Sequence, residues 1–136
     1  MQKVLLVEDD DYISSMYYDK FHNSGFDISL VRDPRKALET ARSFQPDCIL
    51  LDMMMPELSG LDVLAMLKKD PAVQKIPTII LSNVSEKEMR DKARSLGAVH
   101  YLVKAMHTPG QIVDIVRKTL ITPTAPLSTI TSSSSV

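Results

Sequence analysis

The stretch Val-Leu-Leu-Val-Glu-Asp-Asp, residues 4–10, places three acidic residues directly after four apolar ones. A short apolar run bounded by polar residues is typical of a strand that is covered on both faces of a sheet. Similar runs occupy residues 48–51, 78–81 and 99–103. A more alternating run, residues 28–31, is typical of a strand at a sheet edge. The sequence therefore predicts a parallel sheet of five strands.

Segments with an apolar residue every three or four positions separate these runs, which predicts helices with one apolar stripe each. Phe21, Ala41, Leu64, Ala93 and Val116 each belong to one of these stripes. Strand and helix thus alternate five times, and right-handed crossovers between parallel neighbours favour a doubly wound three-layer sandwich. The expected α/β fold is flavodoxin-like, with strand order 2-1-3-4-5.

Residues that begin and end helices support this reading. Asp10 or Asp11 is expected to cap the first helix, and Gly25 and Gly97 are expected to end the first and fourth helices. Pro34 and Pro109 stand where a first helical position is expected. Three further starts are predicted by an oxygen-bearing cap three positions before an acid or amide. These pairs are Ser59 with Asp62, Ser85 with Glu88, and Thr108 with Gln111.

Length and composition indicate one domain, residues 1–121, followed by a Ser/Thr/Pro-rich tail or linker, residues 122–136, that we expect to be disordered. The formal net charge is −1, which offers no overall field for binding nucleic acid or a membrane surface. Cys48 is the single cysteine, so a disulfide within the chain is excluded and a cytoplasmic location is the default. No apolar run approaches the ~18 residues of a membrane span, so a soluble protein is expected.

Polar residues follow four of the apolar runs at the point where each strand is expected to end. Glu8 and Asp9 follow the first run, Asp52 the third, Ser82 the fourth and Lys104 the fifth. Ligands of open parallel sheets bind beyond these carboxyl ends. Two carboxylates ~4 Å apart repel each other by ~4 kcal/mol at an effective dielectric of 20, so such a cluster requires a cation. Hard oxygen ligands without nearby His or Cys favour Mg²⁺.

Four segments together closely resemble the response-regulator receiver family of two-component signal transduction. They are residues 4–10, 50–56, 79–82 and 101–104, and the resemblance spans about residues 2–120. It implies a chemotaxis-regulator-like fold, a Mg²⁺ cofactor, and a phosphoryl group received from a sensor histidine kinase or phosphotransfer protein. It also implies that the chain is no enzyme beyond catalysing its own phosphorylation and dephosphorylation.

The resemblance implies a role for each of seven residues. Asp52 would be the phosphoacceptor, Asp9 and Asp52 would bind Mg²⁺ directly, and Glu8 would hold its waters. The remaining roles fall to the Met54 backbone carbonyl as a further metal ligand, to Lys104 and Ser82 as phosphoryl contacts, and to Ser82 with Tyr101 as the switch. The fourth helix, fifth strand and fifth helix would form the output face, where a homodimer could also form.

One position departs from the family pattern. Ala105 follows Lys104 where the family usually has proline with a cis peptide bond, and a cis bond before a non-proline residue costs ~2.5–4 kcal/mol. We therefore expect a trans bond, or a strained cis bond, and a looser hold on Lys104. We expect the run Met53 to Met55 to serve packing, because thioethers suit soft metal ions. The histidines, expected to be surface or structural residues, are His22, His100 and His107.

Three other functions remain open at this point. An aspartyl-phosphate phosphatase of the haloacid dehalogenase type would use similar chemistry, but it places Asp-x-Asp after its first strand, whereas Asp52 follows the third. A flavin or nucleotide binder could share the fold, but no glycine-rich phosphate-binding motif occurs. A phosphorylation-independent interaction module would keep the fold without the chemistry, and Ala105 leaves this alternative open.

Overall fold

The computed structural model describes residues 1–121, so the predicted tail, residues 122–136, lies outside the described residues. The strands are β1 (Lys3–Val7), β2 (Asp27–Val31), β3 (Cys48–Asp52), β4 (Thr78–Ser82) and β5 (His100–Val103). The α-helices are α1 (Asp11–Asn23), α2 (Ala37–Phe44), α3 (Gly60–Lys69), α4 (Lys87–Ser95) and α5 (Pro109–Ile121). Short 3-10 helices precede α2 (η1, Pro34–Lys36) and follow β5 (η2, Lys104–Met106).

The strands form one parallel sheet in the order β2-β1-β3-β4-β5, which confirms the predicted flavodoxin-like topology. Strand β2 lies at an edge, as its alternating pattern predicted. The strand order reverses at β1, which pairs with β2 on one side and with β3 on the other. The ends of β1 and β3 therefore meet where parallel sheets of this kind bind their ligands.

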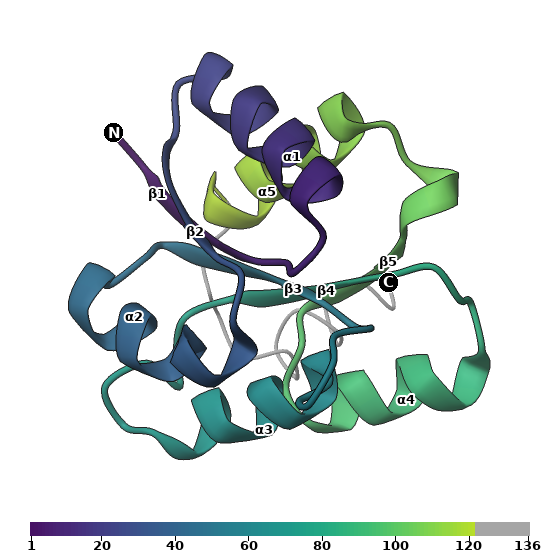
Figure 1. Ribbon diagram of the computed structural model, residues 1–136. Helices are drawn as coiled ribbons and strands as arrows, with labels where there is room; N and C mark the ends of the chain where they lie inside the picture. Colours follow the sequence, from purple (N-terminus) through teal and green to yellow (C-terminus); the bar gives the residue numbers. More distant parts are fainter. Residues whose placement is uncertain (122–136) are drawn as a thin grey trace, which may run out of the picture.

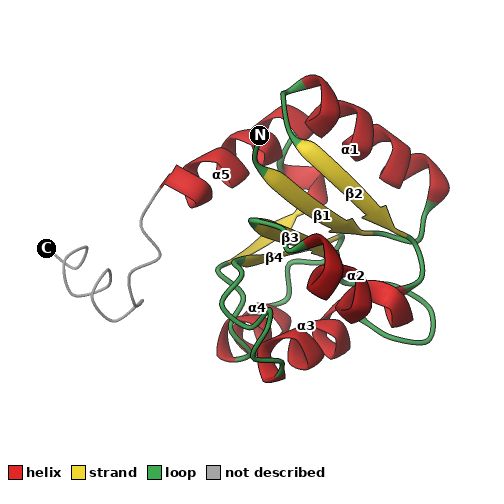
Figure 2. Ribbon diagram, turned by 90° about the vertical axis from the view of Figure 1, so that its left-hand side faces the viewer, coloured by secondary structure: helices red, strands yellow, loops and turns green. Residues whose placement is uncertain are grey.

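Helices cover both faces of the sheet and complete the three layers. Helices α1 and α5 lie on one face, and α2, α3 and α4 lie on the other (Figures 1 and 2). Successive strand residues point to opposite faces, so Val4 and Leu6 pack toward Phe21 and Val116, while Leu5 and Val7 belong to the opposite cluster. Burial on both faces explains why the inner strands are continuously apolar.

Most of the predicted helix ends are confirmed, with one exception. Asp10 caps α1, and the Ser59–Asp62 capping box is present at α3. Thr108 and Gln111 make the reciprocal bonds at α5. The prediction for Ser85 is wrong, because α4 begins at Lys87 and its N-cap residue, Glu86, makes no side-chain capping bond. Within residues 1–121, no helix is both long and apolar enough to cross a membrane.

Candidate functional site

The carboxyl ends of four adjacent strands bring the sequence-predicted residues to one edge of the sheet. Asp52 ends β3 and pairs with Leu81 of β4, and Ser82 ends β4 opposite Val103 of β5. Glu8 follows β1, and its backbone N–H donates to the Val31 carbonyl at 3.0 Å. Residues that are far apart in sequence thus share one site because their strands run in the same direction.

Three carboxylates form the centre of this site. Ligand oxygens of Glu8, Asp9 and Asp52 lie within 4.8 Å of one another, and no other metal-type cluster is found among residues 1–121. Glu8 is 1% exposed and Asp52 is 4% exposed, whereas Asp9 is half-buried. Glu8 also accepts a hydrogen bond from the Asp10 backbone N–H at 3.2 Å, which fixes its carboxylate beside the start of α1.

Lys104 joins two of these carboxylates directly. Its ammonium donates to Asp52 Oδ1 at 2.8 Å and to Glu8 Oε1 at 2.9 Å, with a side chain only 10% exposed. The Lys104–Ala105 peptide bond is trans, as expected for a non-proline residue. The expected looser hold on Lys104 is not what the geometry shows, since two charge-assisted hydrogen bonds fix its head group.

Burial and crowding change the proton affinity of the buried groups. Burial raises the pKa of Glu8 to about 7; the Lys104 hydrogen bond opposes this rise and the Asp52 charge adds to it. Burial by itself would lower the pKa of Lys104, but hydrogen bonds to Asp52 and Glu8 outweigh it and raise that pKa. Once Glu8 is ionised, three carboxylates and one ammonium leave two negative charges, which a divalent cation would balance.

The donor set also fits a magnesium ion chemically. Mg²⁺ prefers oxygen ligands and takes one or two carboxylates while keeping several waters. Asp9 and Asp52 supply such oxygens, and Glu8 is close enough in the cluster to hold water on a bound ion. Met54, whose backbone carbonyl was predicted as a further ligand, lies in the loop directly after β3.

Ser82 and Tyr101 both contact the loop that follows β4. Ser82 is fully buried, and its Oγ accepts from the Val84 backbone N–H at 3.1 Å. The Tyr101 hydroxyl donates to the Val84 carbonyl at 2.9 Å, and its half-buried ring packs beside the core on the α2, α3 and α4 face. The two predicted switch residues are therefore connected through a single residue of the β4–α4 loop.

The methionine triplet divides between core and surface. Met53 and Met55 are buried in the core, as the packing interpretation predicted, but Met54 is 63% exposed at the edge of the site. Of the histidines, His22 and His100 are exposed, and Nδ1 of His107 lies 3.1 Å from the Val103 carbonyl. Their positions agree with the predicted surface or structural roles.

Two features of the site were not predicted from the sequence. Large exposed apolar side chains stand in the segments that follow β1, β3, β4 and β5, namely Tyr12, Met54, Val84 and Met106. We call these four residues the apolar rim. In the sequence, each is an apolar residue two to five positions after a strand and outside any predicted apolar stripe. The second feature is the close approach of Gly60 to the Asp52 backbone, for which the sequence gives no signal.

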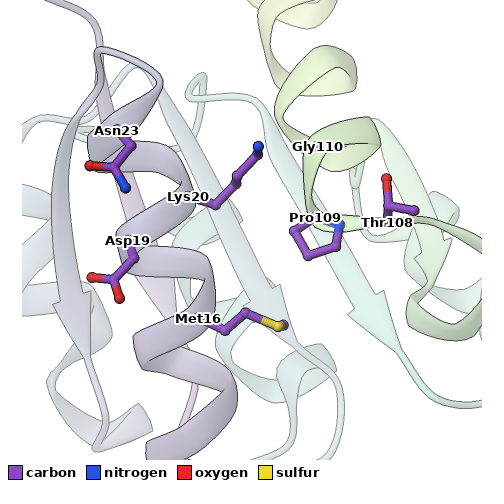
Figure 3. A pocket seen from close by; sticks show the side chains of 7 residues that line it. All are labelled: Met16, Asp19, Lys20, Asn23, Thr108, Pro109 and Gly110. Carbon is purple, nitrogen blue, oxygen red and sulfur yellow. The ribbon is translucent and has the colours of Figure 1, made fainter.

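A separate groove of about 560 Å³ lies between α1 and the start of α5 (Figure 3). Of the residues described, its walls include none of the carboxylates of the acidic cluster. The groove is lined by Met16, Asp19, Lys20, Asn23, Thr108, Pro109 and Gly110. It is thus distinct from the acidic site in both position and composition.

Comparisons with known proteins identify relatives of this chain by sequence. The chain is 32% identical over 108 residues to the polar-differentiation response regulator DivK of Brucella anthropi, an alignment that covers 79% of this chain and 88% of the relative. The same level of identity is found to DivK of Brucella ovis.

Solved structures share the fold of this chain. The receiver domain of the Francisella response regulator 1452 superposes with a TM-score of 0.80 at 29% identity, covering 88% of this chain and 97% of that one. Chemotaxis protein CheY4 of Vibrio cholerae, at 24% identity, shares the fold with a TM-score of 0.81, covering 87% and 98%. The family model for the response regulator receiver domain matches residues 4–117. The chain therefore belongs to the response regulator receiver domain family.

Proposed function

We propose that this receiver domain accepts a phosphoryl group on Asp52 in a Mg²⁺-dependent reaction. The observation that carries the proposal is the buried Asp52 carboxylate, which has Lys104 at 2.8 Å and two further carboxylates within ion-binding distance. Structural ion pairs need no third and fourth charged group at the same point. A site that must first hold a cation and then gain phosphoryl oxygens does need them.

Asp52 would attack the phosphorus of the donor in line, forming a carboxylate O–P bond as the donor bond breaks and its electrons leave with the donor group. Lys104 already lies at the Asp52 oxygen and would neutralise the arriving phosphoryl oxygens. The buried Ser82 hydroxyl would donate to one of them. Glu8, Asp9, Asp52 and the Met54 carbonyl would hold Mg²⁺, which would polarise the phosphoryl group.

The donor is a protein, a sensor histidine kinase or a phosphotransfer protein, in the cytoplasm. Because Asp52 is only 4% exposed at the end of β3, such a donor must cover the surrounding edge in order to reach it. The four residues of the apolar rim stand in the segments that leave this edge, so they are exposed apolar side chains that such a donor would contact. We assign the rim to recognition of the donor.

The output signal would leave through the β4–α4 loop. A new phosphoryl oxygen would accept from the Ser82 hydroxyl and turn it away from the Val84 N–H, from which Oγ now accepts. The Tyr101 hydroxyl is hydrogen-bonded to the same loop residue, and Tyr101 lies on β5. A shift of the loop would therefore move Tyr101 and change the face formed by α4, β5 and α5. Such a switch responds only to the difference in interaction energy between its two states. This face would bind the output partner or a second copy of the chain.

The test is incubation with Mg²⁺ and acetyl phosphate, followed by intact mass measurement. We expect the wild type to gain one phosphoryl group and Asp52→Asn to gain none. Asp47→Asn is the matched control, because Asp47 is exposed and precedes the opposite end of the same strand. Equal modification of the wild type and Asp52→Asn, or no modification of the wild type, would refute the proposal.

A further inference from the structure

The first residue of α3 packs directly on the main chain of Asp52. A Cβ atom built on Gly60 would lie 2.4 Å from the Asp52 carbonyl oxygen, 2.9 Å from Met53 Cα and 3.0 Å from the Asp52 carbonyl carbon. All three neighbours are backbone atoms, which cannot turn aside as the end of a flexible side chain can. A side chain at this position therefore forces the helix and the strand end apart.

The backbone conformation of Gly60 does not itself call for glycine. Its φ lies outside the left-handed region, unlike that of Gly25 at +93°. The tight contact with Asp52, and not the local conformation, is what excludes a side chain here.

Several contacts hold α3 in this place. The Gly60 N–H donates to the Met53 carbonyl at 2.9 Å, and the Met53 N–H donates to the Leu81 carbonyl of β4 at 2.8 Å. The capping box fixes the start of the helix, and Val63 and Leu64 are fully buried in the core. The helix cannot retreat without opening this core, so part of the displacement falls on the end of β3, which carries Asp52.

We propose that Gly60 is a positioning residue for Asp52, because its missing side chain lets α3 hold the phosphoacceptor backbone in register with Lys104. This inference rests on the proposed function. To restore an ordinary contact of 3.4 Å, the Asp52 carbonyl must move about 1 Å from a Cβ at residue 60. The 2.8 Å bond between Asp52 Oδ1 and Lys104 Nζ would lengthen or turn accordingly. A misplacement of this size can cost about 100-fold in rate.

The experiment measures phosphorylation of the full chain by acetyl phosphate at saturating Mg²⁺, for the wild type, Gly60→Ala and Gly110→Ala. Gly110 is the matched control, since it also lies in the first turn of a helix but its Cβ would meet nothing closer than 3.6 Å. We expect Gly60→Ala to lower the maximal rate about 100-fold with little change in the half-saturating donor concentration. Gly110→Ala should keep the wild-type rate.

A second variant separates position from stability. Val116→Ala opens a cavity in the core beneath α5, in the cluster on the opposite face of the sheet from α3, and it should destabilise the fold without moving Asp52. If Gly60→Ala proves unfolded, all rates are measured in a stabilising osmolyte. A wild-type maximal rate for folded Gly60→Ala, or an equally slow Val116→Ala, overturns the positioning role. Failure of the wild type itself to be modified would instead overturn the proposed function.

Discussion

The raised pKa of Glu8 makes the stability of the metal-free protein depend on pH in a specific direction. The ordinary pKa of this carboxyl is 4.5, and the folded protein raises it to about 7. The folded state therefore binds a proton that the unfolded state has already released between these values. Stability from protonated Glu8 is complete below pH 4.5, falls as pH rises, and is lost above about 7.

The size of this effect follows from the same two values. Each pKa unit corresponds to about 1.4 kcal/mol, so Glu8 lowers the unfolding free energy by about 3 kcal/mol across the window. Glu8→Gln carries no charge at any pH and keeps an oxygen that can accept from Lys104. We expect this variant to match the wild type near pH 4.5 and to be more stable by about 3 kcal/mol at pH 8, both without metal.

Urea unfolding with a chelator present, at steps from pH 4.5 to 8, measures this difference directly. Glu39→Gln, on an exposed part of α2, is the control and should give a difference that does not change with pH. At pH 8 added Mg²⁺ should stabilise the wild type more than Glu8→Gln, because it binds the ionised cluster. Parallel curves for wild type and Glu8→Gln would show that Glu8 ionises in the folded protein as it does in water.

Three further predictions concern other parts of the molecule. The Lys68 ammonium donates to two backbone carbonyls at 3.0 Å each. Lys68→Met should therefore lower the free energy of unfolding, measured by heat or urea, by about 1–3 kcal/mol. The same substitution at the exposed neighbour, Lys69→Met, should leave it unchanged. Gly25 has φ +93° and open space around its Cβ, so Gly25→Ala should destabilise by about 1–2 kcal/mol through backbone strain alone, and an unchanged unfolding midpoint would contradict this. The double variant Tyr12→Ser with Met106→Ser should slow transfer from a phosphorylated donor protein about 10-fold or more, because the two lost apolar contacts correspond to at least about 1.4 kcal/mol. Its rate of modification by acetyl phosphate should be unchanged. Equal slowing with both donors would show that the apolar rim does not take part in donor recognition.

Local patterns in the sequence were sufficient for the layout of the fold. Continuous apolar runs predicted the buried strands, and the apolar stripe containing Phe21 predicted the side of α1 that packs into the core. These predictions succeeded because apolar patterning, helical period and capping are each set by a few neighbouring residues. The prediction that Ser85 caps α4 was wrong although its spacing was suitable. In the folded chain, Val84 of the β4–α4 loop is hydrogen-bonded to Ser82 and to the distant Tyr101, and α4 begins only at Lys87.

The residue types of the site were also readable in the sequence, because parallel strands end at a common edge and the acids stand directly after them. The distances between these groups, their burial and their proton affinity could not be read from the sequence. The link between Lys104 and Glu8 spans 96 positions, and the raised pKa of Glu8 depends on what covers it. The contact of Gly60 with Asp52 arises only when α3 packs back onto β3. Sequence alone thus determined which chemical groups face the edge, and tertiary packing decided how closely they meet, because contact and desolvation belong to the folded chain as a whole.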